Sequence, residues 1–197
     1  MPTTAEPSHA NWLDHVEQTE GWLSLQEAEA LYTIASEVTA GVILEVGSYR
    51  GRSAIAISAG APERVPVYTI DPHDHLVESE TLSFGPEDRA AFFRAMLRSG
   101  AYRNTRLINL SSEIIAPGWT DPIGFLWIDG DHTLEGVTRD WRCWRDHLLP
   151  GAVVAFDDAH DQNVGPYHLL QELVGSGELI HRKNIGKVRT LTRPSSA

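Results

Sequence analysis

Two short apolar runs in this sequence each end abruptly in carboxylates. The first run leads into Asp129, with His132 three residues later, and the second leads into Asp157 and Asp158. Runs of this kind are typical of buried parallel strands whose carboxyl ends open into a site. Crowded carboxylates repel one another unless a cation or several donors hold them, and oxygen ligands suit a hard divalent ion such as Mg²⁺ or Mn²⁺. Helix caps or solvated loop acids would explain the same pattern, so both interpretations stay open.

The segment between the two runs predicts how the acids come together. Its apolar residues recur at helical spacing over 134–148, and a Pro-Gly pair follows as a stop. A strand, a helix and a second strand form a right-handed crossover, which makes the two strands parallel and often adjacent. We therefore expect Asp129 to lie near Asp157 and Asp158 at one edge of a sheet.

A glycine-containing turn further upstream predicts a cofactor cradle. Residues 42–46 predict a buried strand, which leads through Gly47 and Gly51 into a small apolar helix over 54–59. Glycine allows close backbone approach, and the free N–H groups at a helix start face a ligand. The pattern lacks the middle glycine of a dinucleotide fingerprint, which disfavours a pyrophosphate site. Turns like this also occur in α/β proteins that bind no ligand.

Polar residues also follow the next two predicted strands. The strand over 67–70 ends at Asp71, about 20 residues beyond the turn, where doubly wound folds place a carboxylate that accepts ribose hydroxyls. The strand over 106–110 leads to Ser112 and Glu113, which are suited either to contacting a heterocycle or to capping the next turn.

The composition excludes several classes of function. The chain has 197 residues, of which 42% are hydrophobic and 22% charged, as in an ordinary globular domain. A net charge of −11 argues against a nucleic-acid partner, because binding the phosphate backbone requires cations. The single cysteine, Cys143, excludes an internal disulfide and is expected to pack. We expect no signal peptide and no membrane span, which makes the cytoplasm the default location. His73 and His75 are expected in a surface loop, where metal ligation is open but solvation is commoner.

The rest of the chain predicts a single domain with a helical start and a closing hairpin. The expected parts are an N-terminal helical cap over 1–40, a cofactor and metal core over 41–160, and a closing helix and hairpin over 161–197. The cap begins with a loose tail over 1–8, and a capping box at Ser24 and Glu27 starts its second helix. A further helix, opened by Gly85-Pro86 and closed by Gly100, is expected to present one apolar side with Phe93, Met96 and Leu97.

Taken in order, these motifs resemble the class I S-adenosylmethionine-dependent methyltransferases. More narrowly, they resemble the small-molecule group related to macrocin O-methyltransferases and, more distantly, to catechol and caffeoyl-CoA O-methyltransferases. The resemblance is carried by Glu45, Gly47, Gly51 and Asp71 and by the segments 128–132 and 150–158. It implies an α/β, Rossmann-like fold with a seven-stranded, mostly parallel sheet, an antiparallel last strand and helices on both faces.

The resemblance also implies roles for individual residues. By position, the S-adenosylmethionine contacts are Glu45, Gly47, Ser48, Gly51 and Ser53 at the amino-acid end, Asp71 at the ribose, and Ser112 or Glu113 near the adenine. The metal acids are Asp129, Asp157 and Asp158. An amide stands at the last position in the catechol-type enzymes, so Asp158 departs from them and agrees with the macrocin-like group. His132 takes the place of a lysine or histidine that follows the first acid in these relatives.

The implied function is a metal-dependent O-methyltransferase that acts on a small-molecule hydroxyl, such as that of a natural-product sugar, a polyketide or a phenol. A divalent ion lowers the pKa of a bound hydroxyl, and His132 would take the proton, although a structural hydrogen bond at the helix start is its alternative role. The alternatives are metal-independent N- or C-methylation, a nicotinamide-dependent oxidoreductase, and a protein that holds the cofactor without turnover. Six tryptophans leave room for an aromatic homo-oligomer interface, although most are expected in the core.

Overall fold

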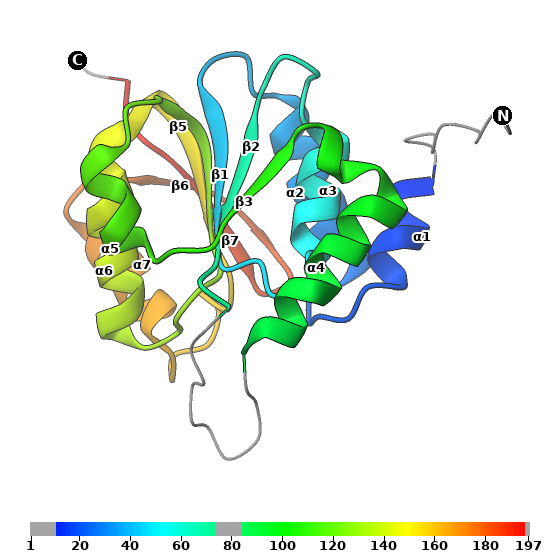
Figure 1. The fold of residues 1–197 in the computed structure, drawn as a ribbon. Helices are drawn as coiled ribbons and strands as arrows, with labels where there is room; N and C mark the ends of the chain where they lie inside the picture. Colours follow the sequence, from blue (N-terminus) through cyan, green and yellow to red (C-terminus); the bar gives the residue numbers. More distant parts are fainter. Residues whose placement is uncertain (1–10, 74–83, 196–197) are drawn as a thin grey trace, which may run out of the picture.

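A seven-stranded sheet with helices on both faces forms the centre of the computed structural model, which describes residues 11–73 and 84–195 (Figure 1). The strand order is β3-β2-β1-β4-β5-β7-β6. The strands are β1 (Val42–Val46), β2 (Val67–Ile70), β3 (Thr105–Ile108), β4 (Ile123–Ile128), β5 (Leu148–Phe156), β6 (Ile180–Ile185) and β7 (Val188–Thr192). Strands β1 to β5 are parallel, and β7 runs antiparallel to both of its neighbours. The predicted sheet is confirmed.

Two apolar clusters cover the two faces of the sheet. The helices are α1 (Trp12–Glu17), α2 (Leu25–Ser36), α3 (Arg52–Gly60) and α4 (Pro86–Ser99) on one face, and α5 (Ser112–Ile115), α6 (Leu134–Trp144) and α7 (Gly165–Gly175) on the other (Figure 1). Short 3₁₀ turns are η2 (Ala101–Arg103), η3 (Ala116–Gly118) and η4 (Arg145–His147). Successive strand residues alternate between the faces, so Ile43 and Phe125 join the first cluster while Leu44 and Leu126 join the second. Both sides of the sheet are therefore buried.

The strand register brings the carboxyl ends of the central strands into one row. Val46 pairs with Ile70 on one side and with Ile128 on the other, and Ile128 pairs with Phe156. The strand order reverses between β1 and β4, which is the position where open α/β sheets place their ligands. The residues that directly follow these strands therefore share one edge.

Two predicted local signals are confirmed. Ser24 and Glu27 form a reciprocal capping box at the start of α2. Helix α4 begins directly after Gly85 and ends at Gly100, whose φ of 80° suits glycine. No helix in the described ranges is long and apolar enough to span a bilayer.

Two expectations about packing are wrong. Leu148 starts β5 instead of ending the preceding helix, because it pairs with Ile123 of β4. Helix α4 buries Phe92 and Met96, while Phe93 and Leu97 are exposed. Neighbouring rows of residues along a helix repeat with the same spacing, so the spacing alone does not show which row is buried.

The expected core role of the tryptophans is confirmed for several of them. Trp127, Trp141 and Trp144 are buried, whereas Trp22 is 59% exposed. The expected N-terminal tail and His75 lie outside the described residues.

Candidate functional site

The β1–α3 turn approaches the end of β4 so closely that only glycine fits at its start. Gly47 has a φ of 83°, and a Cβ added there would lie 2.1 Å from the carbonyl oxygen of Asp129. Gly51, with a φ of 90°, precedes the first residue of α3. L-residues with side chains disfavour both conformations. The two glycines singled out in the sequence are therefore needed for the shape of the turn.

Asp71 fastens this turn to the end of β2. Its Oδ2 accepts hydrogen bonds from the backbone N–H groups of Ser48 (2.9 Å) and Tyr49 (2.8 Å), and its Oδ1 accepts one from the N–H of His73 (3.1 Å). The carboxylate predicted to accept ribose hydroxyls thus also positions the backbone of the cradle.

His73 is buried, so the expectation of a solvated surface-loop residue is wrong. Its side chain is packed beneath the turn with Nε2 2.6 Å from the carbonyl oxygen of Tyr49, and Asn109 Nδ2 lies 3.1 Å from Nδ1. Donation from Nε2–H and acceptance at Nδ1 fit one neutral tautomer. Because both ring nitrogens have partners, the structure gives His73 a role in supporting the turn and not one as a metal ligand.

Glu45 brings an incompletely satisfied carboxyl group to the end of β1. The residue is fully buried, and one oxygen accepts a hydrogen bond from the Ser53 hydroxyl of α3. The other oxygen, Oε2, has no hydrogen-bond partner among the described residues. Burial raises the pKa of Glu45 well above its usual range, and the Ser53 bond opposes this rise. A buried oxygen without a hydrogen bond costs free energy, and a hydrogen-bond donor from a ligand would remove that cost.

The polar residues after β3 lie against α6. Ser112 is buried, and its hydroxyl accepts a hydrogen bond from Trp144 Nε1 at 3.0 Å. Ser111 stands at the N-cap position of α5 but makes no side-chain cap bond, and Glu113 is exposed. The capping alternative is therefore wrong for the serine side chains, and among the adenine candidates only Glu113 presents an exposed side chain.

Asp140, beside this serine, is a buried acid that the sequence reasoning missed. It lies on α6, and burial raises its pKa to about 6 against the opposing effect of a hydrogen bond with Ser112. The only signal in the sequence is its position on the predicted apolar face, beside Trp141.

The predicted acid cluster at the ends of β4 and β5 is present. Ligand atoms of Asp129, His132 and Asp157 lie within 4.8 Å of one another. His132 lies between two carboxylates, with Nε2 3.3 Å from Asp129 Oδ1 and Nδ1 3.3 Å from Asp158 Oδ2. Asp158 has a φ of 49°, a conformation uncommon for a residue with a side chain. The crossover expected from the sequence thus brings all three aspartates into one neighbourhood.

Lys187 is a member of this cluster that the sequence reasoning missed. Its Nζ donates to Asp157 Oδ2 at 2.5 Å and lies 3.6 Å from Asp158 Oδ1. Lys187 reaches the acids from the start of β7, about 30 residues along the chain. A signal existed in the composition, because Lys183 and Lys187 are the only lysines in the sequence.

Burial and neighbouring charges shift the pKa values in the cluster. Burial alone would lower the pKa of His132, but hydrogen bonds to Asp129 and Asp158 outweigh it and raise the value to about 10. Burial, together with repulsion from Asp129, raises the pKa of Asp157, and Lys187 opposes that rise. The two carboxylates therefore favour the protonated form of the imidazole in the metal-free cluster.

The donor set fits a divalent cation. Asp157 is 2% exposed, and its Oδ1 has no hydrogen-bond partner among the described residues. The carboxylate oxygens of Asp129 and Asp157 suit Mg²⁺ or Mn²⁺. The cluster differs from the predicted set, because the geometry groups His132 with Asp129 and Asp157 while both Asp158 oxygens contact cationic side chains.

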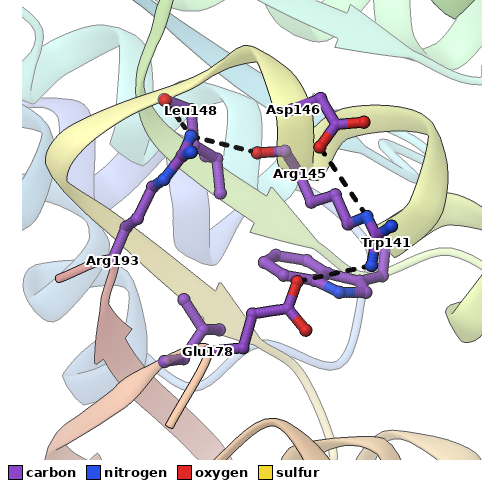
Figure 2. A pocket seen from close by; sticks show the side chains of 7 residues that line it. Trp141, Arg145, Asp146, Leu148, Glu178 and Arg193 are labelled. Carbon is purple, nitrogen blue, oxygen red and sulfur yellow. Dashed lines mark hydrogen bonds and ion pairs between the residues drawn. The ribbon is translucent and has the colours of Figure 1, made fainter. Parts of the chain in front are cut away.

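A pocket of about 340 Å³ lies at the opposite end of β5, away from the acid cluster (Figure 2). Leu148 lines it at the start of that strand, whereas Asp157 follows the strand's other end. Arg193 directs its guanidinium to the backbone carbonyls of Arg145 and Leu148. The guanidinium donors of Arg193 are therefore used within the chain.

Comparison with known proteins agrees with this arrangement. Residues 44–159 match the family model described as a methyltransferase domain, and this range includes the turn and the three aspartates of the acid cluster. Three solved structures share the fold at low sequence identity. Cofactor-bound Rv0187 from MTB has a TM-score of 0.73 at 16% identity and covers 98% of this chain and 93% of its own. The O-methyltransferase TomG from Streptomyces achromogenes, involved in tomaymycin synthesis and solved with SAM, has a TM-score of 0.68 at 16% identity. The match covers 95% of this chain and 88% of TomG. The Bacillus cereus O-methyltransferase, solved with SAH, has a TM-score of 0.71 at 15% identity. The match covers 93% of this chain and 91% of that enzyme.

Proposed function

This chain belongs to the methyltransferase domain family, and on that premise we propose that it is a metal-dependent O-methyltransferase. It moves the methyl group of S-adenosylmethionine to a hydroxyl of a small molecule, such as a natural-product sugar, a polyketide or a phenol. The observation that carries the proposal is the meeting of a glycine turn and a cation-binding acid cluster at one sheet edge, where Gly47 lies against the backbone of Asp129. The SAM and SAH complexes of the two O-methyltransferases above support the choice of cofactor and acceptor atom.

The β1–α3 turn is the proposed cofactor cradle. S-adenosylmethionine supplies an electrophilic methyl group when it is bound. Gly47 and Gly51 let the backbone approach the ligand, and the buried Glu45 offers an oxygen without a hydrogen-bond partner among the described residues. Ser48 and Ser53 complete the turn, and Asp71 keeps it in place while presenting its carboxylate at the proposed ribose position.

The acid cluster is the proposed metal site. Asp129 and Asp157 would hold the ion, joined by Asp158 once its oxygens are released. A divalent ion there supplies a cation that lowers the pKa of the acceptor hydroxyl. Oδ1 of the buried Asp157, which has no hydrogen-bond partner in the described part of the chain, supports this assignment.

His132 is the proposed general base. Asp158 contacts Nδ1 and orients the ring. Nε2, which contacts Asp129, is the atom that would take the substrate proton once that contact is broken. The imidazolium cannot accept a proton, so the base must first lose the one that Asp129 and Asp158 stabilise. Additional positive charge beside Asp129 lowers the pKa of His132 and favours that loss.

Metal-independent N- or C-methylation is the second candidate, and one observation favours it. Lys187 and His132 already place two cationic groups among the three aspartates. In this mechanism the acids would bind a polar substrate directly, with no change in the proposed cofactor cradle.

Differential scanning fluorimetry with S-adenosylhomocysteine, NAD and NADP tests the cofactor assignment. We expect S-adenosylhomocysteine to raise Tm by several degrees and the nicotinamide cofactors to leave it unchanged, because a ligand that binds only the folded state stabilises it by mass action. A larger shift with NAD would replace the methyltransferase proposal by an oxidoreductase.

Methyl transfer from labelled S-adenosylmethionine to a panel of sugars, polyketides and phenols then tests whether the reaction requires the metal. Activity should stop with chelator and return with Mg²⁺, whereas full turnover in chelator would favour the metal-independent candidate.

A further inference from the structure

The ammonium of Lys187 lies where the proposed metal site needs a cation. Its Nζ is 2.5 Å from Asp157 Oδ2 and 3.6 Å from Asp158 Oδ1, so it bridges two of the three predicted metal acids. The Lys187 side chain is only 19% exposed. A divalent ion that uses the same Asp157 oxygen therefore competes with the ammonium for this position.

The N-terminal cap fixes the backbone from which Lys187 extends. The N–H of Lys187 donates to Glu27 Oε1 at 2.7 Å, and Glu27 Oε2 accepts from the N–H of Ser24 at 2.8 Å. A Cβ added to Gly186, the preceding residue, would lie 2.3 Å from Glu27 Oε1, so the hairpin turn packs directly on this carboxylate. The turn is clamped to α2, and the long lysine side chain is the part that can move.

A lysine is better suited than an arginine to an ion pair that must be broken when another cation binds. The ammonium is a compact point charge on a flexible stem, whereas guanidinium makes planar, two-point contacts with carboxylates. Fourteen of the sixteen basic residues in this chain are arginine, and Lys187 is the lysine that contacts the acids. This chemistry favours a contact that can be broken and remade.

Asp157 retains an acceptor that Lys187 does not satisfy. The residue is 2% exposed, and its Oδ1 has no hydrogen-bond partner within the described ranges. One ammonium thus leaves the buried carboxylate incompletely satisfied, and a ligand that contacts both oxygens, or a hydrated ion, would complete it.

We propose that Lys187 is a built-in competitor for the divalent ion, which occupies Asp157 in the metal-free protein and withdraws when the ion binds. The inference rests on the proposed metal-dependent function and adds a residue that sets the affinity of its metal site. Lys187 holds the acids together when no ion is present, and it weakens metal binding because its contact must be broken first.

Mn²⁺ binding to matched variants tests the competition without any methyl acceptor. Lys187→Met removes the ammonium and keeps an unbranched side chain, and Lys183→Met, at an exposed position of the same hairpin, is the control. Free Mn²⁺ is followed by its electron paramagnetic resonance signal during titration. We expect Lys187→Met to bind Mn²⁺ at least about tenfold more tightly than the wild-type chain, as expected when a like charge a few ångströms away is removed. Equal or weaker binding by Lys187→Met, with normal binding by Lys183→Met, overturns the inference.

Lysine labelling of the wild-type chain provides a second measurement that does not depend on folding of a variant. Brief acylation with an N-hydroxysuccinimide ester, read by peptide mass spectrometry, reports the accessibility of Lys183 and Lys187 separately. Saturating Mg²⁺ should speed labelling of Lys187 severalfold and leave Lys183 unchanged. Bound metal with no change at Lys187 overturns the competition and leaves the proposed metal site intact. Absence of Mn²⁺ binding by both the wild-type chain and Lys187→Met overturns the metal site and the competition together.

Discussion

The two halves of the functional edge are held together in different ways. In the β1–α3 turn, backbone N–H groups donate to Asp71, and the buried His73 contacts the carbonyl oxygen of Tyr49. In the acid cluster, Asp157 and Asp158 are held by the cationic side chains of Lys187 and His132. The fold itself therefore fixes the shape of the turn, while the proposed function requires the cluster to exchange one cation for another. Substitutions in the turn should affect folding and cofactor binding together, and those in the cluster should separate metal binding from folding.

Gly47→Ala should have the largest effect, because it combines backbone strain with a collision. The added Cβ would lie 2.1 Å from the carbonyl oxygen of Asp129 at a φ of 83°. We expect a loss of about 3–5 kcal/mol in the free energy of unfolding and no Tm response to S-adenosylhomocysteine. Urea denaturation and differential scanning fluorimetry measure the two effects.

Gly175→Ala is the matched control, because nothing lies within 4 Å of a Cβ added there. It should change stability by less than about 1 kcal/mol. A Gly47→Ala chain as stable as this control would show that the turn can move away from β4 and that the fold does not fix its shape.

Asp71→Ala should have the next largest effect. It removes the acceptor of three backbone N–H groups, those of Ser48, Tyr49 and His73. Loss of a charged acceptor with several donors is expected to cost about 2–4 kcal/mol. Isothermal titration calorimetry below the lowered Tm should detect little binding of S-adenosylhomocysteine. Undiminished affinity would remove Asp71 from the cofactor site and leave it a purely structural role.

Asp157→Asn tests the other half of the comparison. The substitution keeps the shape of a buried side chain and removes its charge, so we expect Mn²⁺ affinity to fall roughly 100-fold. Folding should be retained and the S-adenosylhomocysteine response should stay normal. Without metal, removing repulsion from Asp129 offsets the lost contact with Lys187. A chain that loses cofactor binding as well would show that the two halves are not separable.

The gathering of the acids is predicted by local patterns and one topological rule, whereas the seven-stranded sheet is implied by the resemblance to the methyltransferase family. Apolar runs locate β4 and β5, and the right-handed crossover then places Asp129 beside Asp157. The structure adds that the Gly47 turn lies at the same edge, because β1 lies next to β4.

Long-range side-chain packing is what the sequence could not supply. The contact between Lys187 and Glu27 joins residues 160 positions apart, and no periodicity or motif encodes it. His73 is a polar residue that follows a strand, which predicts a position in a surface loop. Its burial depends on how the chain after β2 folds against the backbone of Tyr49. Such contacts depend on how the sheet and its helices are arranged. The contacts between cationic side chains and the acids of the cluster could therefore be found only in the structure.

The smallest predicted effect is a pH dependence that reports how the cluster is held without metal. Hydrogen bonds to Asp129 and Asp158 overcome burial and raise the pKa of His132 to about 10, above the value of about 6.5 expected in the unfolded chain. A raised pKa stabilises the folded protein fully below about pH 6.5, and this contribution is lost as the pH rises towards 10. The side chain is 32% exposed, so solvent screening reduces the effect to about 1 kcal/mol. Urea denaturation in chelator at several pH values should show the stability difference between wild type and His132→Asn shrinking over this range. His168→Asn, at an exposed histidine of α7, should show no such trend, and a flat difference for His132→Asn would mean that the aspartates do not hold an imidazolium.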